Sequence, residues 1–192
     1  MKRLYFKYGV MGSSKSAQAL MTAFNYSQKG YKVLLIKPSV DTREKSSVIS
    51  SRIGLTAPCF TFDKSTNLID FVLKTAPHTQ VLIVDEAQFC TKEQIDELKE
   101  LTAKDMVVLC YGLKTNFKSE LFEGSKRLLE IAESIQEIKA VCRCGSKATI
   151  NARVVNGLVV TEGKEIQIGG DEKYEAMCYA CWKKYQHEKL SK

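Results

Sequence analysis

Gly9-Val10-Met11-Gly12-Ser13-Ser14-Lys15-Ser16 separates a strand-like run, residues 4–8, from a helix-like run that begins at Lys15. A glycine-rich turn between a strand and a helix N-terminus is a phosphate cradle, because unpaired backbone N–H groups and the helix dipole face the anion there. In the pattern G-x-x-x-x-G-K-[ST], the lysine reaches the outer phosphates and the hydroxyl residue binds Mg²⁺. We therefore expect residues 9–16, the phosphate loop, to bind a nucleotide.

The phosphate loop departs from that pattern at one position. Gly9, Lys15 and Ser16 match, but Ser14 stands where the second glycine is expected. Serine carries a Cβ atom, so a backbone conformation with positive φ costs free energy at this position. The alternative interpretation is a Ser/Gly turn that only caps the following helix.

Length, composition and charge limit the class of protein. The chain has 192 residues, 44% of them hydrophobic and 27% charged, which is typical of a globular protein with one domain, or with one domain and a small appendage. The net charge of +7 suits anionic ligands, but the lysines are scattered, which favours an ordinary solvated surface over a nucleic-acid site. No apolar run approaches the ~18 residues of a membrane span, and the N-terminal run is too short for a signal peptide. We therefore expect a cytoplasmic protein that binds neither membrane nor nucleic acid.

Apolar runs and turn signals predict alternating strands and helices. Strands are expected at 32–37, 59–62, 81–84, 106–112 and 135–141. Helices are expected at 67–74 with Ser65 or Thr66 as N-cap, after Thr91, and at 124–132. Residues 39–54 read as a long polar loop, and residues 148–155 and 158–160 as a hairpin around Asn156-Gly157.

This alternation, with the phosphate loop in it, predicts an α/β nucleotide-binding fold with a mostly parallel sheet and helices on both faces. Residues 1–141 would form this nucleotide-binding domain. Ligands of such sheets bind at the carboxyl ends of the strands. Because both the phosphate loop and Asp85-Glu86 follow strands, we expect them to share one site.

Asp85-Glu86 supplies the acidic groups that a phosphate loop requires. One carboxylate can hold Mg²⁺, and a second can take a proton from an attacking hydroxyl. Because the chain has only two histidines, another residue type is expected to act as the base. Lys15 and Arg43 are the candidate cations for the transferred phosphoryl group. The alternative for Asp85-Glu86 is a strand end followed by a helix cap.

The seven cysteines divide into two groups. Cys142, Cys144, Cys178 and Cys181 form two close pairs, and four thiolates match a closed structural zinc site. Such a site would staple a small second domain, residues 142–192, although the first pair is a tight C-x-C. A thioredoxin-like redox pair is the alternative, but the strand–helix unit it needs is missing. The other three, Cys59, Cys90 and Cys110, are expected in the core.

Four aromatic residues, Phe89, Phe117, Phe122 and Tyr174, fall in expected connecting segments. An aromatic slot beside a phosphate site would suit a planar base. Ordinary core packing is the alternative.

Taken in order, these features resemble the type II thymidine kinase family, whose members carry a zinc-bearing lasso. The resemblance spans nearly the whole chain and rests on the phosphate loop with Met11, Asp41-Thr42-Arg43, Asp85-Glu86-Ala87-Gln88-Phe89, residues 113–122, Ile168-Gly169-Gly170 to Tyr174, and the two cysteine pairs.

The resemblance implies a Mg²⁺-dependent transfer of the ATP γ-phosphoryl group to the 5′-hydroxyl of thymidine, and of deoxyuridine. Glu86 would be the general base, with Asp85 and Ser16 on Mg²⁺ and Arg43 facing the phosphoryl group. The residues expected on the nucleotide are Gly9, Met11, Gly12, Ser13, Ser14, Lys15, Ser16, Asp85 and Gln88.

The resemblance implies a P-loop NTPase-like α/β fold of the RecA type. It also implies a nucleoside pocket closed by main-chain groups of the lasso. Its expected residues are Met11, Phe89, Leu113, Phe117, Phe122, Ile166, Ile168, Gly169, Gly170 and Tyr174. Asn151 falls near a pocket position that is often threonine, and no role is assigned to it. Family members are usually homotetramers that dTTP inhibits.

Two other functions fit parts of the sequence. A P-loop ATPase or nucleotide-regulated binding protein with a zinc module would hydrolyse ATP regardless of thymidine. A zinc-containing nucleic-acid binder would bind DNA or RNA with a steep salt dependence.

Overall fold

The computed structural model describes residues 3–39, 47–163 and 173–190. A six-stranded sheet organises the larger part of the chain, and all its pairings are parallel. Its spatial order is β5 (Phe60–Phe62), β2 (Val33–Pro38), β6 (Val81–Val84), β7 (Val107–Gly112), β1 (Leu4–Tyr8) and β8 (Ser134–Glu137). The predicted parallel α/β sheet is therefore confirmed.

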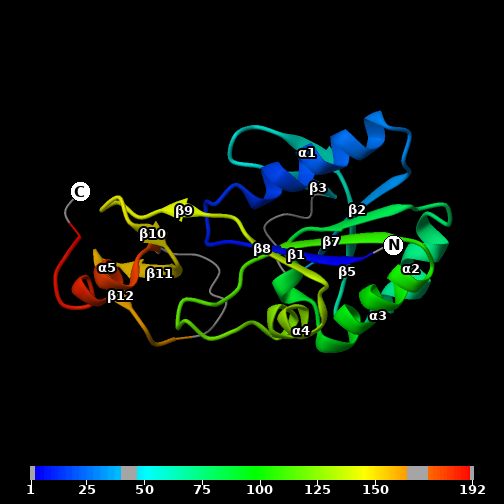
Figure 1. The fold of residues 1–192 in the computed structure, drawn as a ribbon. Helices are drawn as coiled ribbons and strands as arrows, with labels where there is room; N and C mark the ends of the chain where they lie inside the picture. Colours follow the sequence, from blue (N-terminus) through cyan, green and yellow to red (C-terminus); the bar gives the residue numbers. More distant parts are fainter. Residues whose placement is uncertain (1–2, 40–46, 164–172, 191–192) are drawn as a thin grey trace.

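Helices cover both faces of this sheet, as Figure 1 shows. On β6, Val81 and Ile83 pack in one core cluster with α1 (Lys15–Gln28). Leu82 and Val84 face the opposite cluster, which includes apolar residues of α2 (Leu68–Thr75), α3 (Lys92–Ala103) and α4 (Glu123–Ile131). Since successive strand residues point to opposite faces, a strand buried on both sides must be apolar throughout.

A small lobe follows the sheet, and we use this name for the elements from β9 to α5. A hairpin pairs β9 (Ala140–Val141) with β10 (Lys147–Ala148). A separate three-stranded antiparallel sheet has the order β12 (Leu158–Val160), β11 (Ile150–Val155) and β13 (Lys173–Met177), followed by α5 (Tyr179–Lys184). In Figure 1 this lobe lies to one side of the large sheet, beyond the ends of β1 and β8. The domain boundary at residues 141 and 142 stays a prediction.

The Asn156-Gly157 hairpin forms as predicted. Asn156 and Gly157 have φ angles of 52° and 82°, and Val155 pairs with Leu158 across the turn. Two successive residues with positive φ match the right-handed twist of the flanking strands. The predicted first strand is divided, however, because Ala148 belongs to β10 and pairs with Ala140 of β9, whereas Ile150 begins β11.

Three other predicted elements differ from the structure. Residues 135–141 do not form one strand, because at Ile138 the chain leaves β8 and its N–H donates to the Tyr8 carbonyl at 2.7 Å. The cap of α2 is Asn67, whose side chain accepts from the Asp70 N–H at 2.9 Å. The 39–54 loop contains β3 (Val48–Ser50), which pairs with β4 (Thr56–Pro58).

The N-terminus of α3 is closed by a capping box, which confirms the cap predicted at Thr91. The Thr91 hydroxyl accepts from the Gln94 N–H, and the Gln94 side chain accepts from the Thr91 N–H, both at 3.2 Å. Two backbone donors that the helix cannot pair are thereby satisfied. The short 3-10 helix η1 (Ala87–Phe89) precedes it, so the box also fixes the chain just after Asp85-Glu86.

Replacing Thr91 with alanine is expected to lower the free energy of unfolding by about 1 kcal/mol, because one backbone donor loses its partner. Urea denaturation followed by circular dichroism measures this change. Thr102→Ala is the control, because that hydroxyl only donates back to the Lys99 carbonyl inside the same helix. The control should stay within about 0.5 kcal/mol of the wild type. Equal losses in both variants would contradict the capping role.

Candidate active site

The phosphate loop and the end of β6 meet through one hydrogen bond. Ser16 Oγ donates to Asp85 Oδ2 at 2.8 Å, although the two residues are far apart in the sequence. Asp85 is only 4% exposed, and its other carboxylate oxygen, Oδ1, has no hydrogen-bond partner among the described residues. Burial, and after it the charge of Glu86, raise the pKa of Asp85 to about 6, although the Ser16 hydrogen bond and the charge of Lys15 oppose the shift.

A buried carboxylate with one open oxygen beside a serine hydroxyl is the donor set that a small oxygen-binding cation prefers. The residues present therefore fit Mg²⁺. An unpaired buried carboxylate is unfavourable, so a cation bound at Oδ1 would also stabilise the folded site.

Lys15 lies at the start of α1 with 7% of its surface exposed, and its Nζ donates to the Val10 carbonyl at 2.9 Å. Burial lowers the pKa of Lys15, and the carboxylates of Glu86 and Asp85 oppose this shift. The ammonium group therefore interacts electrostatically with the acidic pair, and its bond to the Val10 carbonyl holds it beside the phosphate loop.

Ser14 adopts the left-handed conformation that its place in the loop requires, with φ 64° and ψ 26°. This conformation costs a residue with a Cβ atom about 1 kcal/mol. The Ser14 side chain makes no capping hydrogen bond to α1. The alternative interpretation, a turn whose serine caps the helix, therefore lacks its main contact.

Glu86 also has a left-handed backbone, with φ 54°, and its side chain is half-buried. The Gln88 Nε2 group donates to Glu86 Oε2, and Gln88 Oε1 accepts from the Leu113 N–H at 3.0 Å. Gln88 is 2% exposed, so its amide is a buried link between the carboxylate and the chain just after β7. The link fixes the Glu86 side chain, while the predicted contact of Gln88 with nucleotide stays a prediction.

The four predicted aromatic residues lie in different surroundings, and the aromatic slot for a planar base stays a prediction. Phe89 and Phe122 meet edge to face, with ring centroids 5.6 Å apart. Phe117 is 1% exposed, and the guanidinium carbon of Arg153 lies 4.9 Å from its ring centroid. Tyr174 was predicted in a connecting segment, but it lies in β13 opposite Arg153, because residues 173–177 complete the sheet beside β11.

A cavity of about 370 Å³ opens on the phosphate loop. It is lined by residues 11–14, Arg52, residues 139–141, Arg143 and residues 174–176. Arg52, Lys139 and Arg143 bring three cations to it, and Arg143 also pairs with Glu175 at 2.8 Å. The cavity thus unites Met11 with Tyr174, and its charge suits an anion. Glu86, Leu113 and the three phenylalanines are not among the described residues that line it.

Five predicted site residues lie outside the described part of the chain. These are Arg43, Ile166, Ile168, Gly169 and Gly170.

Sequence reasoning assigned no role to Arg153 or Asn151, which are 3% and 2% exposed. Both lie on β11, and they pair with Tyr174 and Ala176 on β13. Their spacing of two was the available signal, since alternate strand residues share a face. The sequence did not reveal that this face is buried, because polar residues usually mark the solvent face.

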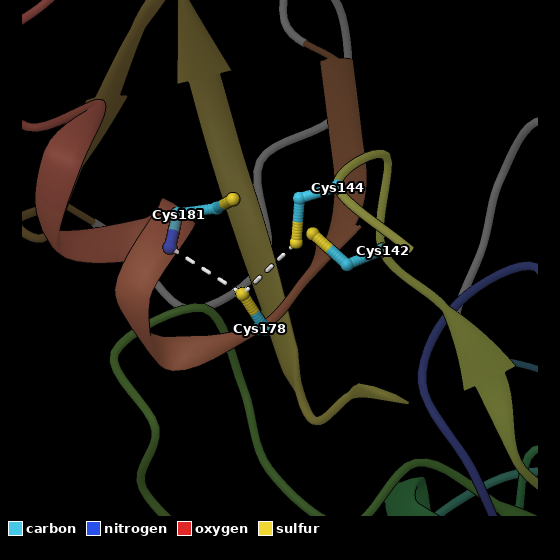
Figure 2. A group of neighbouring side chains, drawn as sticks. All are labelled: Cys142, Cys144, Cys178 and Cys181. Carbon is cyan, nitrogen blue, oxygen red and sulfur yellow. Dashed lines mark hydrogen bonds between the residues drawn. The ribbon is translucent and has the colours of Figure 1, made fainter. Parts of the chain in front are cut away.

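The four cysteines of the small lobe gather into one cluster, as predicted. Their sulfur atoms all lie within 4.8 Å of one another (Figure 2). Four sulfurs around zinc lie about 3.8 Å apart when each Zn–S bond is about 2.3 Å, so the cluster fits a tetrahedral zinc ion.

A tight turn lets both cysteines of the short C-x-C pair join the cluster. The Gly145 N–H donates to the Cys142 carbonyl, and the Cys142 N–H donates to the Ser146 carbonyl, both at 2.8 Å. Cys178 caps α5, and its sulfur accepts from the Cys181 N–H at 3.5 Å. The other three cysteines are buried, which confirms their predicted place in the core.

Comparison with known proteins finds a matching family and several relatives of this chain. A sequence profile of the family described as "Thymidine kinase" matches residues 2–182. A thymidine kinase of Zymomonas mobilis is 45% identical over 184 residues, covering 93% of this chain and 94% of that protein. Thymidine kinases of Legionella pneumophila and Rhodopirellula baltica are 43% and 40% identical, covering 98% and 93% of this chain and 92% and 86% of theirs.

Metal analysis of the purified chain is expected to find about one zinc ion per chain. Cys178→Ser should lose most of the metal and unfold at a lower temperature, because the small lobe loses its staple. Cys90→Ala is the control, since Cys90 is buried outside the cluster, and it should keep its zinc. Full zinc content in Cys178→Ser would contradict the site.

Proposed function

Because the chain belongs to the thymidine kinase family, we propose that its phosphate loop, the acidic end of β6 and the small lobe act together in one active site. The chain is an ATP-dependent deoxynucleoside kinase that phosphorylates thymidine. The observation that carries the proposal is the hydrogen bond between Ser16 and Asp85, with the open Asp85 Oδ1 beside it.

The phosphate loop and Lys15 bind the donor phosphates of ATP in this proposal. The backbone N–H groups at the start of α1 face the anion, and Lys15 donates a second N–H to a phosphate oxygen while it keeps its bond to the Val10 carbonyl. Ser16 and Asp85 would hold Mg²⁺, which when bound neutralises charge on the phosphates. Since phosphoryl transfer depends mainly on position and charge, these groups account for the donor half of the site.

Glu86 is the proposed general base. Its carboxylate is half-buried at the end of β6, next to Asp85, and the Gln88 amide holds one of its oxygens. The other carboxylate oxygen can accept the proton of the thymidine 5′-hydroxyl as the hydroxyl oxygen attacks the γ-phosphorus of ATP. The bond between that phosphorus and the β–γ bridging oxygen then breaks, and ADP leaves. The strained backbone at Glu86 is consistent with a position selected for function, because such strain clusters at active sites.

The nucleoside is proposed to bind between the chain after β7 and the small lobe. The Leu113 N–H donates to Gln88, so this segment is linked to the residue that orients Glu86, the proposed general base. Phe89 supplies apolar surface, while Phe117 and Phe122, which are 1% and 8% exposed, would line the pocket from the core. Met11 and Tyr174 approach from the phosphate loop and β13. A pocket enclosed on these sides admits a pyrimidine and excludes a purine by size.

We also propose deoxyuridine as a second substrate, a homotetrameric assembly in the cytoplasm and inhibition by dTTP. A nucleoside triphosphate that carries thymine could place its base in the nucleoside pocket and its phosphates in the phosphate loop. One molecule would then block both halves of the site. For the described residues, no helix has the length and apolar character needed to cross a membrane.

A coupled assay of ADP release tests the function. Thymidine should stimulate the release strongly and deoxyuridine less, whereas deoxycytidine and purine nucleosides should leave it near background. ATP hydrolysis that does not respond to any nucleoside would instead support an ATPase.

Glu86→Gln is expected to lower kcat for thymidine by about 10²–10⁴-fold, because the attacking hydroxyl loses its proton acceptor. ATP should still bind with similar affinity in calorimetry, since the donor half of the site is intact. Glu93→Gln is the matched control, because Glu93 is exposed in the first turn of α3. A Glu86→Gln enzyme with normal turnover would exclude Glu86 as the base.

A further inference from the structure

The peptide group between Val10 and Met11 is held at both ends. Its carbonyl accepts from Lys15 Nζ at 2.9 Å, and its N–H donates to Asn151 Oδ1 at 2.7 Å. Lys15 and Asn151 are 7% and 2% exposed, so both hydrogen bonds are shielded from water. Because the two groups belong to one rigid peptide plane, the side chain of Asn151 fixes the direction in which the carbonyl meets the lysine.

The other end of the Asn151 amide reaches the segment after β7. Its Nδ2 donates to the Thr115 carbonyl at 2.9 Å, and Thr115 is 9% exposed. One partner is a donor and the other an acceptor, so the orientation of the amide is determined. Asn151 thus joins β11 of the small lobe to the phosphate loop and to the proposed nucleoside segment.

The small lobe also holds the Val10 side chain. Val10 is 7% exposed and belongs to the core cluster that contains Ile150 and Met177. The first half of the phosphate loop is therefore placed by the small lobe through both a side chain and a peptide group. The second half belongs to α1.

We propose that Asn151 is a positioning residue for Lys15. By fixing the plane of the Val10–Met11 peptide, its amide sets where the lysine ammonium is held before phosphate binds. The same amide also binds the Thr115 carbonyl, so the phosphate loop, which binds ATP, keeps a fixed position relative to the segment proposed to bind the nucleoside. This inference rests on the proposed kinase function.

Without Asn151, the peptide plane can rotate and turn its carbonyl away from the ammonium. A buried peptide N–H without a partner favours such a rotation, because the unpaired donor carries a desolvation cost. Lys15 would then adopt other positions, and transfer would slow, since small misplacements reduce phosphoryl transfer strongly. Asn151 does not select the base directly, because its two amide groups are already committed to Met11 and Thr115.

Kinetics of Asn151→Leu and Asn151→Asp test the proposal. In Asn151→Leu, kcat should fall about tenfold or more, while KM for thymidine changes less than about threefold. Asn151→Asp keeps the acceptor for Met11 but places a carboxylate against the Thr115 carbonyl, so its kcat should fall less. Val155→Ala is the control, because Val155 lies on the same strand, outside the cluster that holds Val10, and makes neither hydrogen bond. A kcat in Asn151→Leu equal to that of the control would overturn the proposal.

A double-mutant cycle tests whether Asn151 acts through Lys15. If it does, adding Asn151→Leu to Lys15→Ala should cause little further loss of kcat/KM for ATP in a radiometric assay. Multiplying losses would mean that the two residues act independently, which contradicts a positioning role.

Hydrogen exchange of the Met11 amide tests the contact without relying on activity. In the wild-type enzyme and in Val155→Ala this amide should be protected, whereas in Asn151→Leu it should exchange about tenfold faster or more. If Asn151→Leu does not fold, the protected Met11 amide in Asn151→Asp carries the test, and an unprotected one overturns it. A wild-type enzyme that does not phosphorylate thymidine would reject the proposed function, whereas an unprotected Met11 amide would reject only this inference.

Discussion

The hydrogen bond between Ser16 and Asp85 is the contact on which the site depends, because it joins two segments that the sequence keeps far apart. A parallel sheet makes the contact possible. β1 and β6 are separated by β7 and run in the same direction, so their carboxyl ends open on one edge. The loop after β1 and the acidic pair after β6 then meet without long connections. The apolar strands are therefore a requirement of the site as well as of the core.

The small lobe contributes geometry that the large sheet cannot provide. Its core is small, and a cluster of four thiolates is the kind of staple that such a unit needs. Val10 packs into that core, and Asn151 accepts a hydrogen bond from the Met11 N–H. The phosphate loop is therefore positioned by both the large sheet and the small lobe. A site assembled in this way makes nucleotide binding depend on the lobe proposed to close over the nucleoside.

Much of this arrangement could be predicted from the sequence, because local signals agreed with the fold. The strand–loop–helix at residues 4–28, the continuous apolar run before Asp85 and the Asn156-Gly157 turn each have a simple physical reading. Ser14 stands where the pattern has a glycine, and the structure gives it the left-handed backbone that glycine adopts most easily. The four cysteines could be grouped because they fall in two close pairs, C-x-C and C-x-x-C.

The rest depends on tertiary contacts that no local pattern reveals. The strand predicted at 135–141 is interrupted because Ile138 binds the end of β1, and Asn67 rather than Ser65 or Thr66 caps α2. Asn151 and Arg153 look like ordinary polar strand residues until β11 is buried against the phosphate loop and Phe117. Their importance follows from burial, which is a property of the assembled chain.

The most direct test of a single site that binds both ATP and thymidine is the fate of the γ-phosphoryl group. The enzyme is incubated with γ-labelled ATP, Mg²⁺ and thymidine, and the labelled products are separated and identified. The account predicts that the label appears in thymidine 5′-monophosphate, in equal amount to the ADP formed. Label released as inorganic phosphate at the same rate with and without thymidine would contradict it.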